Sequence, residues 1–246
     1  MAKFKLRAKR TYVASVRGVG AVLNAAGVLG WLERRQGRRG YHWMRSLFAI
    51  YDLDQFIALD VPWWTYHAID RVDDFLRARS NASVFEFGSG ASTIWLARRA
   101  GAVHSVEHDR SWFDLMQSRI APYPHIQLSF APADEVPSAD QLFHSRKEGH
   151  EGESFEDYVA AITSTGQTYD LIVIDGRARP ACLRIAQHCL SQGGMIIFDN
   201  TKRKRYATAI ADSGLAAIHL PGLTPSLPYP DKTTLLQSRM PQDPHV

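Results

Sequence analysis

The chain has 246 residues, of which 45% are hydrophobic and 22% charged, and its formal net charge is +4. These values argue against long-range disorder and fit one α/β domain with terminal extensions. Its two cysteines, Cys182 and Cys189, lie seven residues apart in a helical pattern, which excludes a disulfide or metal-binding spacing and indicates a reduced, cytoplasmic protein.

Basic residues are concentrated at the start of the chain. Residues 1–45 hold eleven Lys and Arg against a single acid, Glu33, so this segment carries +10 and the remainder carries −6. We predict a basic N-terminal arm over residues 1–40. Three interpretations stay open: a solvated terminus, peripheral membrane contact through residues 1–45, and contact with nucleic acid, which would not be sequence-specific because no groove-reading module is present.

An uncharged stretch at residues 18–32 bears on the membrane interpretation. It is too short to span a bilayer and contains four glycines, which weaken any helix. Arg17 interrupts the apolar run and no cleavage site follows, which argues against a signal peptide. A membrane contact would therefore be peripheral.

Residues 41–82 carry aromatic side chains at spacings that favour helices, and we predict a helical cap there. From residue 83 to 246 short apolar runs alternate with amphipathic stretches, which predicts an α/β core with a parallel sheet. The predicted strands lie at residues 83–87, 102–106, 126–130, 171–174, 195–198, 215–220 and 233–237. The predicted helices lie at residues 92–100, 110–120, 155–163, 181–190 and 206–212.

The loop after the first predicted strand is rich in small residues. It reads Glu86-Phe87-Gly88-Ser89-Gly90-Ala91-Ser92-Thr93. The two glycines permit a tight turn and a close approach of the backbone to a ligand, and Ser89 or Ser92 is expected to cap the following helix. The third glycine of the dinucleotide fingerprint would fall at Thr93. A carboxylate at Glu86 would repel a diphosphate and attract an ammonium group, so the loop favours a cofactor with an amino-acid end.

Acidic residues also end the other predicted strands. In an open parallel sheet these ends meet at one edge, where ligands bind. Glu107, followed by His108, is placed to accept hydrogen bonds from ribose hydroxyls. Asp134 is either an adenine contact or a loop carboxylate. Asp175 and Asp199 follow apolar runs whose packing does not require an acid.

These segments resemble a known family. The sequences Phe-Glu-Phe-Gly-Ser-Gly at 85–90, Val-Glu-His-Asp at 106–109 and Asp-Gly-Arg-Ala-Arg at 175–179 are similar to those of class I S-adenosylmethionine-dependent methyltransferases, particularly a group of bacterial methyltransferase-like proteins. The resemblance covers residues 83–239. It implies a Rossmann-like seven-stranded sheet, mostly parallel with an antiparallel last strand, and helices on both faces. It also implies that Glu86 and the glycines hold the methionine part, Glu107 the ribose, and that Asp175 faces the transfer site.

A metal site is a further implication. Asp175, Asp199 and Asn200 resemble the Mg²⁺ triad of the catechol O-methyltransferase group, and such a metal would lower the pKa of an attacking hydroxyl. Arg177 and Arg179 lie at the same edge; these cations disfavour a metal and suit an anionic substrate instead.

Methyl transfer requires alignment of donor and acceptor more than a covalent nucleophile. We predict a methyltransferase acting on a small-molecule or glycan-type acceptor, with O-methylation as the reaction and Asp175, Asp199 and Arg177 as catalytic candidates. Two alternatives remain: an NAD-type oxidoreductase, against which Thr93 and Glu86 argue, and a non-catalytic protein of the same fold tethered through its basic arm.

Overall fold

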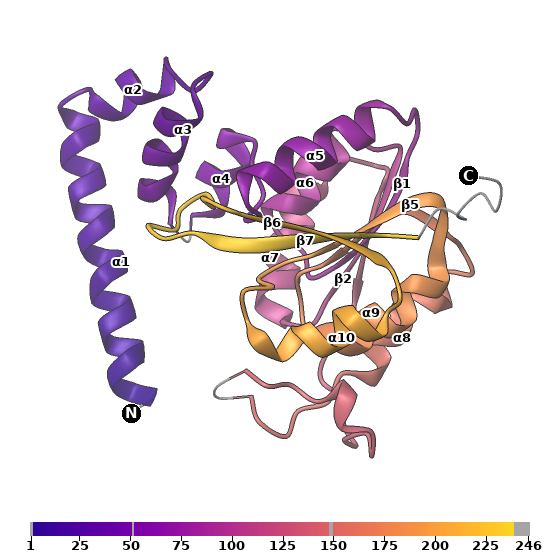
Figure 1. Cartoon of the computed structure of the whole chain (residues 1–246). Coiled ribbons are helices and arrows are strands. Elements are labelled where there is room, and N and C mark those ends of the chain that lie inside the picture. Colours follow the sequence, from indigo (N-terminus) through magenta and orange to yellow (C-terminus); the bar gives the residue numbers. More distant parts are fainter. Residues whose placement is uncertain (1, 51, 148–149, 239–246) are drawn as a thin grey trace.

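A seven-stranded sheet forms the centre of the computed structural model, which describes residues 2–50, 52–147 and 150–238, with side chains from residue 13 onward (Figure 1). The strand order is β3-β2-β1-β4-β5-β7-β6. β7 runs antiparallel to β5 and β6, and the other neighbours are parallel. This arrangement confirms the Rossmann-like methyltransferase sheet. The strands are β1 Ser83–Phe87, β2 Ala102–Glu107, β3 Ile126–Phe130, β4 Tyr169–Ile174, β5 Leu190–Phe198, β6 Ala216–Gly222 and β7 Asp231–Gln237.

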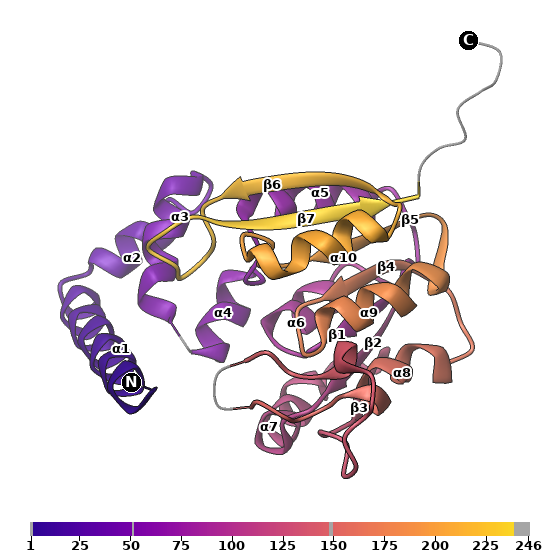
Figure 2. The same cartoon turned by 60° about the horizontal axis from the view of Figure 1, so that its bottom comes forward.

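Helices cover both faces of the sheet (Figure 2). On one face the strands contribute Val84, Leu171 and Ile197 to an apolar core with α4 Leu53–Leu59, α5 Tyr66–Arg77 and α6 Ala91–Ala97. On the other face, strand side chains such as Phe85 and Ile172 pack with α8 Glu156–Ser164, α9 Arg179–Ala186 and α10 Ala207–Asp212. α7 Arg110–Ile120 contacts β2 and β3. Because side chains alternate along a strand, β1, β2, β4, β5 and β7 each contribute to both cores.

The start of β5 differs from the prediction. The sequence predicted a helix over residues 181–190 and a strand from residue 195, but α9 ends at Ala186 and β5 already begins at Leu190. Leu190 pairs with Tyr169, and the register shifts between Tyr169 and Leu171. Gly193, at φ 71°, accommodates this irregularity, so Gly193 and Gly194 lie within the strand.

The predicted cap segment contains α3 Arg39–Ser46, η1 Leu47–Ala49, α4 and α5. Its aromatic side chains enter the same core as the sheet: Phe56 and Trp64 are buried beside α5 and α6. Several hydrogen bonds join this segment to the C-terminal hairpin. Trp43 Nε1 donates to the Leu227 carbonyl (3.0 Å), and the Thr65 amide donates to Thr233 Oγ1 (3.1 Å).

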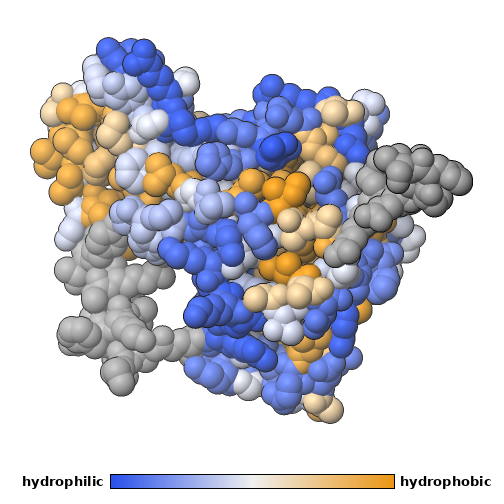
Figure 3. Space-filling view, viewed as in Figure 1, coloured by the Kyte–Doolittle hydropathy of each residue, from blue (hydrophilic) through white to orange (hydrophobic). Residues whose placement is uncertain are grey.

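The N-terminal segment forms two helices, α1 Ala2–Ala25 and α2 Val28–Glu33, and α1 stands apart from the sheet (Figure 1). The sequence suggested that glycines would weaken a helix here, but α1 continues through Gly18 and Gly20, and the chain turns at Gly27, where φ is 73°. Figure 3 shows apolar surface on this part of the molecule. Val22 of α1 and Trp31 of α2 are exposed. Within the described residues, no helix is long and apolar enough to cross a membrane.

Candidate active site

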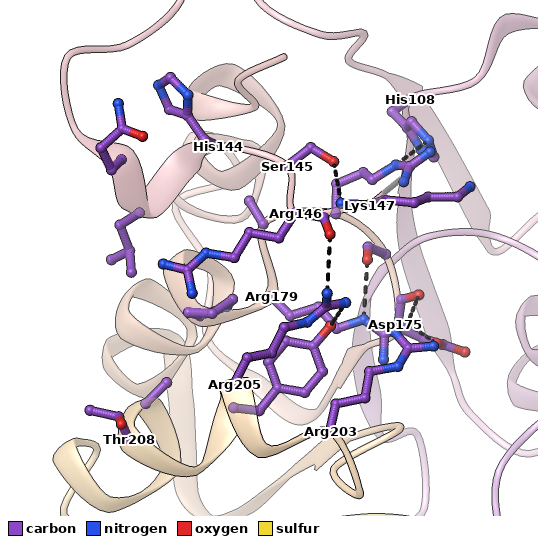
Figure 4. Close-up of a pocket in the computed structure, with 18 of the residues that line it drawn as sticks. His108, His144, Ser145, Arg146, Lys147, Asp175, Arg179, Arg203, Arg205 and Thr208 are labelled. Carbon is purple, nitrogen blue, oxygen red and sulfur yellow. Dashed lines mark hydrogen bonds and ion pairs between the residues drawn. The ribbon is translucent and has the colours of Figure 1, made fainter. Parts of the chain in front are cut away.

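The predicted site residues follow the carboxyl ends of the central strands, as parallel strands require. A cavity of about 630 Å³ opens beyond the end of β4. Asp175, Arg177 and His108 line it, together with side chains from residues 141–147 and 203–212 (Figure 4). The glycine loop after β1 adjoins this cavity through the backbone of Gly176.

Glu86 lies beneath the glycine loop, with no exposed surface. Its carboxylate accepts hydrogen bonds from the hydroxyls of Ser92, Thr93 (2.5 Å) and Ser105 (2.6 Å). Burial raises the pKa of Glu86 to about 7, against the effect of these donors. The side chain thus organises the loop from below, and direct contact with an ammonium group, as the sequence suggested, would require the loop to move.

The glycine loop is built on backbone contacts. Gly88 has φ 95°, and a Cβ placed there would lie 3.0 Å from the Gly176 Cα, so the loop packs tightly on the end of β4. Gly90, in contrast, has open space on its Cβ side, with Ser92 Oγ the nearest atom at 3.9 Å. Ser89 or Ser92 was expected to cap α6, but Gly90 is the N-cap. The hydroxyls of Ser89 and Ser92 are instead bound to Glu107 and Glu86, respectively.

Glu107 ends β2 and is 2% exposed. Its Oε2 accepts hydrogen bonds from the Ser89 amide (3.1 Å) and hydroxyl (3.0 Å), and its Oε1 accepts from the amides of His108 (2.7 Å) and Asp109 (2.9 Å). Burial opposes ionisation, but the contacts with His108 and the backbone amides outweigh it and hold the pKa of Glu107 below its usual value. The carboxylate is therefore ionised at neutral pH and joined to the glycine loop.

A buried arginine links the two acidic residues that follow β4 and β5, through the carboxylate of Asp175 and the backbone carbonyl of Asp199. Arg179 donates to Asp175 Oδ1 (2.6 Å), to the Asp175 carbonyl (2.7 Å) and to the Asp199 carbonyl (2.7 Å). Asp199 is 2% exposed and accepts a hydrogen bond from Thr233 (2.7 Å). Burial, together with the nearby Asp175, raises the pKa of Asp199 to about 8. Asp175 lines the cavity, whereas Asp199 lies behind it.

This arrangement does not fit the Mg²⁺ site that the sequence suggested. The Asp175 carboxylate already accepts a hydrogen bond from Arg179, and the Asn200 amide group donates to Asp231 Oδ2 (3.0 Å). No group of three or more His, Cys, Asp or Glu side chains in the described part of the chain could hold a metal ion. A guanidinium bound between the candidate ligands would repel a divalent cation.

Two further residues predicted for the site, Arg177 and Asp134, lie in different surroundings. Arg177 lines the cavity and donates from Nε to His108 Nε2 (2.8 Å). Asp134 lies at the start of α8, where its carboxylate accepts hydrogen bonds from the Ser154 hydroxyl and the Glu156 amide (2.8 Å). These contacts order the connection that follows β3, and an adenine contact for Asp134 stays a prediction.

Sequence reasoning missed most of the cations around the cavity. Arg146 and Lys147 come from the long connection, and Arg203 and Arg205 from the segment that precedes α10. The run Lys202-Arg203-Lys204-Arg205, which begins three residues after Asp199, was a signal in the sequence that could have identified part of this wall.

No family model matches the chain, and no curated protein matches it either. Among solved structures, a methyltransferase-like protein from Silicibacter pomeroyi is 22% identical, covers 72% of this chain and 89% of its own, and has a TM-score of 0.47. An rRNA methylase from Streptococcus thermophilus is 14% identical (70% and 96% covered, TM-score 0.47), and a precorrin 8w decarboxylase from Methanobacterium thermoautotrophicum is 17% identical (72% and 93% covered, TM-score 0.48). At these identities the likeness concerns the fold alone.

Asp199 makes stability depend on pH. Its pKa of about 8 in the folded chain exceeds its usual 3.8, so its contribution to the free energy of unfolding is complete below about pH 4 and is lost as the pH rises toward 8. We expect wild-type stability, measured by urea unfolding, to fall relative to that of Asp199→Asn between pH 5 and pH 8. The exposed Asp74→Asn is the control and should follow the wild type. Parallel curves for wild type and Asp199→Asn would contradict the assignment.

Proposed function

We propose that the protein is an S-adenosylmethionine-dependent methyltransferase. The observation that carries the proposal is the pairing of an ionised, buried Glu107 with the glycine loop across β1 and β2. A carboxylate at this place is suited to ribose hydroxyls, and the open side of Gly90 leaves room for a ligand against the backbone. Both features serve any nucleoside cofactor, so the rest of the loop must distinguish among them.

The surroundings of Glu86 favour a sulfonium cofactor over a dinucleotide. In the dinucleotide fingerprint a third glycine brings helix and strand together, but Thr93 stands there and binds Glu86 and the Gly90 amide (2.9 Å) through its hydroxyl. A diphosphate at the start of α6 would lie above the Glu86 carboxylate, which disfavours it when ionised. The methionine part of S-adenosylmethionine adds no phosphate.

The residues that would hold the cofactor are Gly88, Ser89 and Gly90 through the backbone, and Glu107 through its carboxylate. The Ser89 hydroxyl donates a hydrogen bond to Glu107 Oε2, and a ribose hydroxyl would replace it as the donor. His108 lies beside Glu107, with its Nδ1 2.8 Å from Oε1. When bound, S-adenosylmethionine supplies a methyl group activated by the sulfonium charge.

Asp175 is the side chain we assign to the acceptor. It lines the cavity, and burial raises its pKa in spite of the Arg179 cation, which makes the carboxylate a stronger base. It would take the proton from an acceptor hydroxyl, with Arg177 as a second group at the cavity wall. Asp199, buried behind Asp175 and protonated at neutral pH, would support Asp175 without touching the acceptor. We propose a small-molecule or glycan-type acceptor and O-methylation.

Calorimetric titration of the whole chain with S-adenosylhomocysteine and with NAD tests the proposal. We expect saturable binding of S-adenosylhomocysteine and none of NAD. The opposite result would favour an oxidoreductase, and binding of neither would favour a non-catalytic protein of this fold. Repeating the titration with excess EDTA should leave the dissociation constant unchanged, because the donor set does not fit a metal.

A further inference from the structure

The cavity beside Asp175 has a strongly cationic wall. Six basic side chains line it, and they come from three separate segments of the chain (Figure 4). They are Arg146, Lys147, Arg177, Arg179, Arg203 and Arg205. Among the described residues that line it, the acids are Asp175 and Asp212, and Asp175 is already paired with Arg179. Basic side chains therefore outnumber acidic ones in the described lining of the cavity.

Four of these arginines differ from arginines elsewhere in the molecule. Among the described residues, no carboxylate lies within 4 Å of the guanidinium groups of Arg146, Arg177, Arg203 or Arg205. On the cap side, by comparison, Arg98, Arg99 and Arg119 are bound to Asp60, Asp73 and Asp54 at 2.6 to 2.7 Å. Arginine without a carboxylate at a concave site is suited to bind an external anion.

Some of these cations are held in place by polar contacts that leave their charge unbalanced. Arg205 donates to the Arg146 carbonyl (3.1 Å) and to the Tyr206 hydroxyl (3.1 Å), which ties two lining segments together. Arg177 donates to a histidine nitrogen instead of a carboxylate. Burial would raise the pKa of Tyr206, but Arg179, Arg205 and Arg203 outweigh it and lower that pKa. The field in the cavity thus already favours negative charge.

We propose that this cavity binds a small molecule bearing a phosphate group and that this molecule is the methyl acceptor, an inference whose second part rests on the proposed function. Phosphate presents several acceptor oxygens to the donors of Arg203, Arg205 and Arg146, and guanidinium groups bind it in a bidentate manner. The remainder of the molecule would share the cavity with Asp175 and His108, which also line it next to the cofactor loop.

Size and charge favour a small molecule over a nucleic acid. A cavity of about 630 Å³ lies within the range of small-molecule sites. The chain beyond residue 45 carries a net charge of −6, which would repel an extended polyanion that has to follow the surface for many phosphates.

Calorimetric titration with inorganic pyrophosphate tests the cavity, using the whole chain at low ionic strength. We expect saturable binding, weakened about 100-fold or more in Arg203→Gln/Arg205→Gln, because two charge-assisted contacts are lost. Arg71→Gln/Arg77→Gln removes the same charge from the exposed surface of α5 and should bind as the wild type does. Citrate and a single-stranded oligonucleotide, titrated in parallel, separate phosphate from carboxylate and from nucleic acid.

Each result has a defined meaning. Equal losses in both double variants, absence of saturable pyrophosphate binding, or tighter binding of citrate or the oligonucleotide would overturn the proposal. S-adenosylhomocysteine should bind both variants as it binds the wild type, which shows that the loss is local to the cavity. If pyrophosphate binds as expected but S-adenosylhomocysteine does not bind the wild type, the anion site stands and the proposed function fails.

Discussion

Replacement of Arg179 by methionine should lower the free energy of unfolding by about 3–5 kcal/mol, because it leaves buried carboxyl groups without their cation. Arg179 is 8% exposed and donates to Asp175 Oδ1 and to the carbonyls of Asp175, Gly176 (3.1 Å) and Asp199. Methionine fills the space but satisfies none of these acceptors. Urea unfolding at pH 7 measures the loss, and we expect it to grow as the pH rises, since Asp175 and Asp199 then have to ionise without a partner.

Arg184→Met is the matched control. Arg184 lies on the same helix, and its ion pair with Asp140 is about half exposed on both sides, so its removal should change stability by less than about 1 kcal/mol. The double variant Asp175→Asn/Arg179→Met should recover part of the loss, because the uncompensated charge of Asp175 is removed with it. Equal stabilities of Arg179→Met and Arg184→Met would show that the buried network does not hold this edge of the sheet together.

Substitution of Glu107 by alanine should weaken binding of S-adenosylhomocysteine about 10- to 150-fold, the loss expected for charge-assisted hydrogen bonds to a ribose. Two effects combine here. The carboxylate that would receive the ribose hydroxyls is removed, and the amides of Ser89, His108 and Asp109 lose the acceptor that fixes the loop. Calorimetric titration at pH 7.5 measures the change in the dissociation constant.

Glu156→Ala is the control for this experiment, since Glu156 is an exposed acid in the first turn of α8 outside the glycine loop. Its dissociation constant should match that of the wild type. Glu107→Gln separates charge from shape: it keeps the length of the side chain but exchanges an acceptor for a donor, so its affinity should also fall. An unchanged dissociation constant in Glu107→Ala would show that Glu107 does not bind the cofactor.

The architecture of the core could be predicted from the sequence because short apolar runs and amphipathic stretches alternate there with few interruptions. Each predicted strand is present, and the acids that follow them lie at one edge of the sheet, as the geometry of parallel strands requires. The antiparallel last strand followed from the resemblance to methyltransferases. No periodicity in the chain specifies the direction of β7.

The surroundings of each acid could not be predicted, because they depend on contacts between distant segments. Ser105 reaches Glu86 only because the register of β1 and β2 places the two residues side by side. Arg179 binds Asp175 rather than solvent because α9 begins at Arg179, only four residues after Asp175. Of the cationic residues at the cavity, Arg146 comes from a loop and Arg205 from a single 3₁₀ turn, and the sequence pattern determines the position of neither.

The hydrogen bonds between the cap and the C-terminal hairpin have a consequence for the order in which the chain folds. The hydrogen-bond partner of Trp43 lies 184 residues further along the chain, and that of Thr65 lies 168 residues further along. At a synthesis rate of about 5–20 residues per second, roughly 10–40 s pass before Leu227 follows Trp43 out of the ribosome. During that interval the apolar side chains of the cap, Phe56 and Trp64 among them, have no finished sheet to cover them. The nascent chain therefore presents an aromatic surface on which chaperones can act, and on which aggregation can begin.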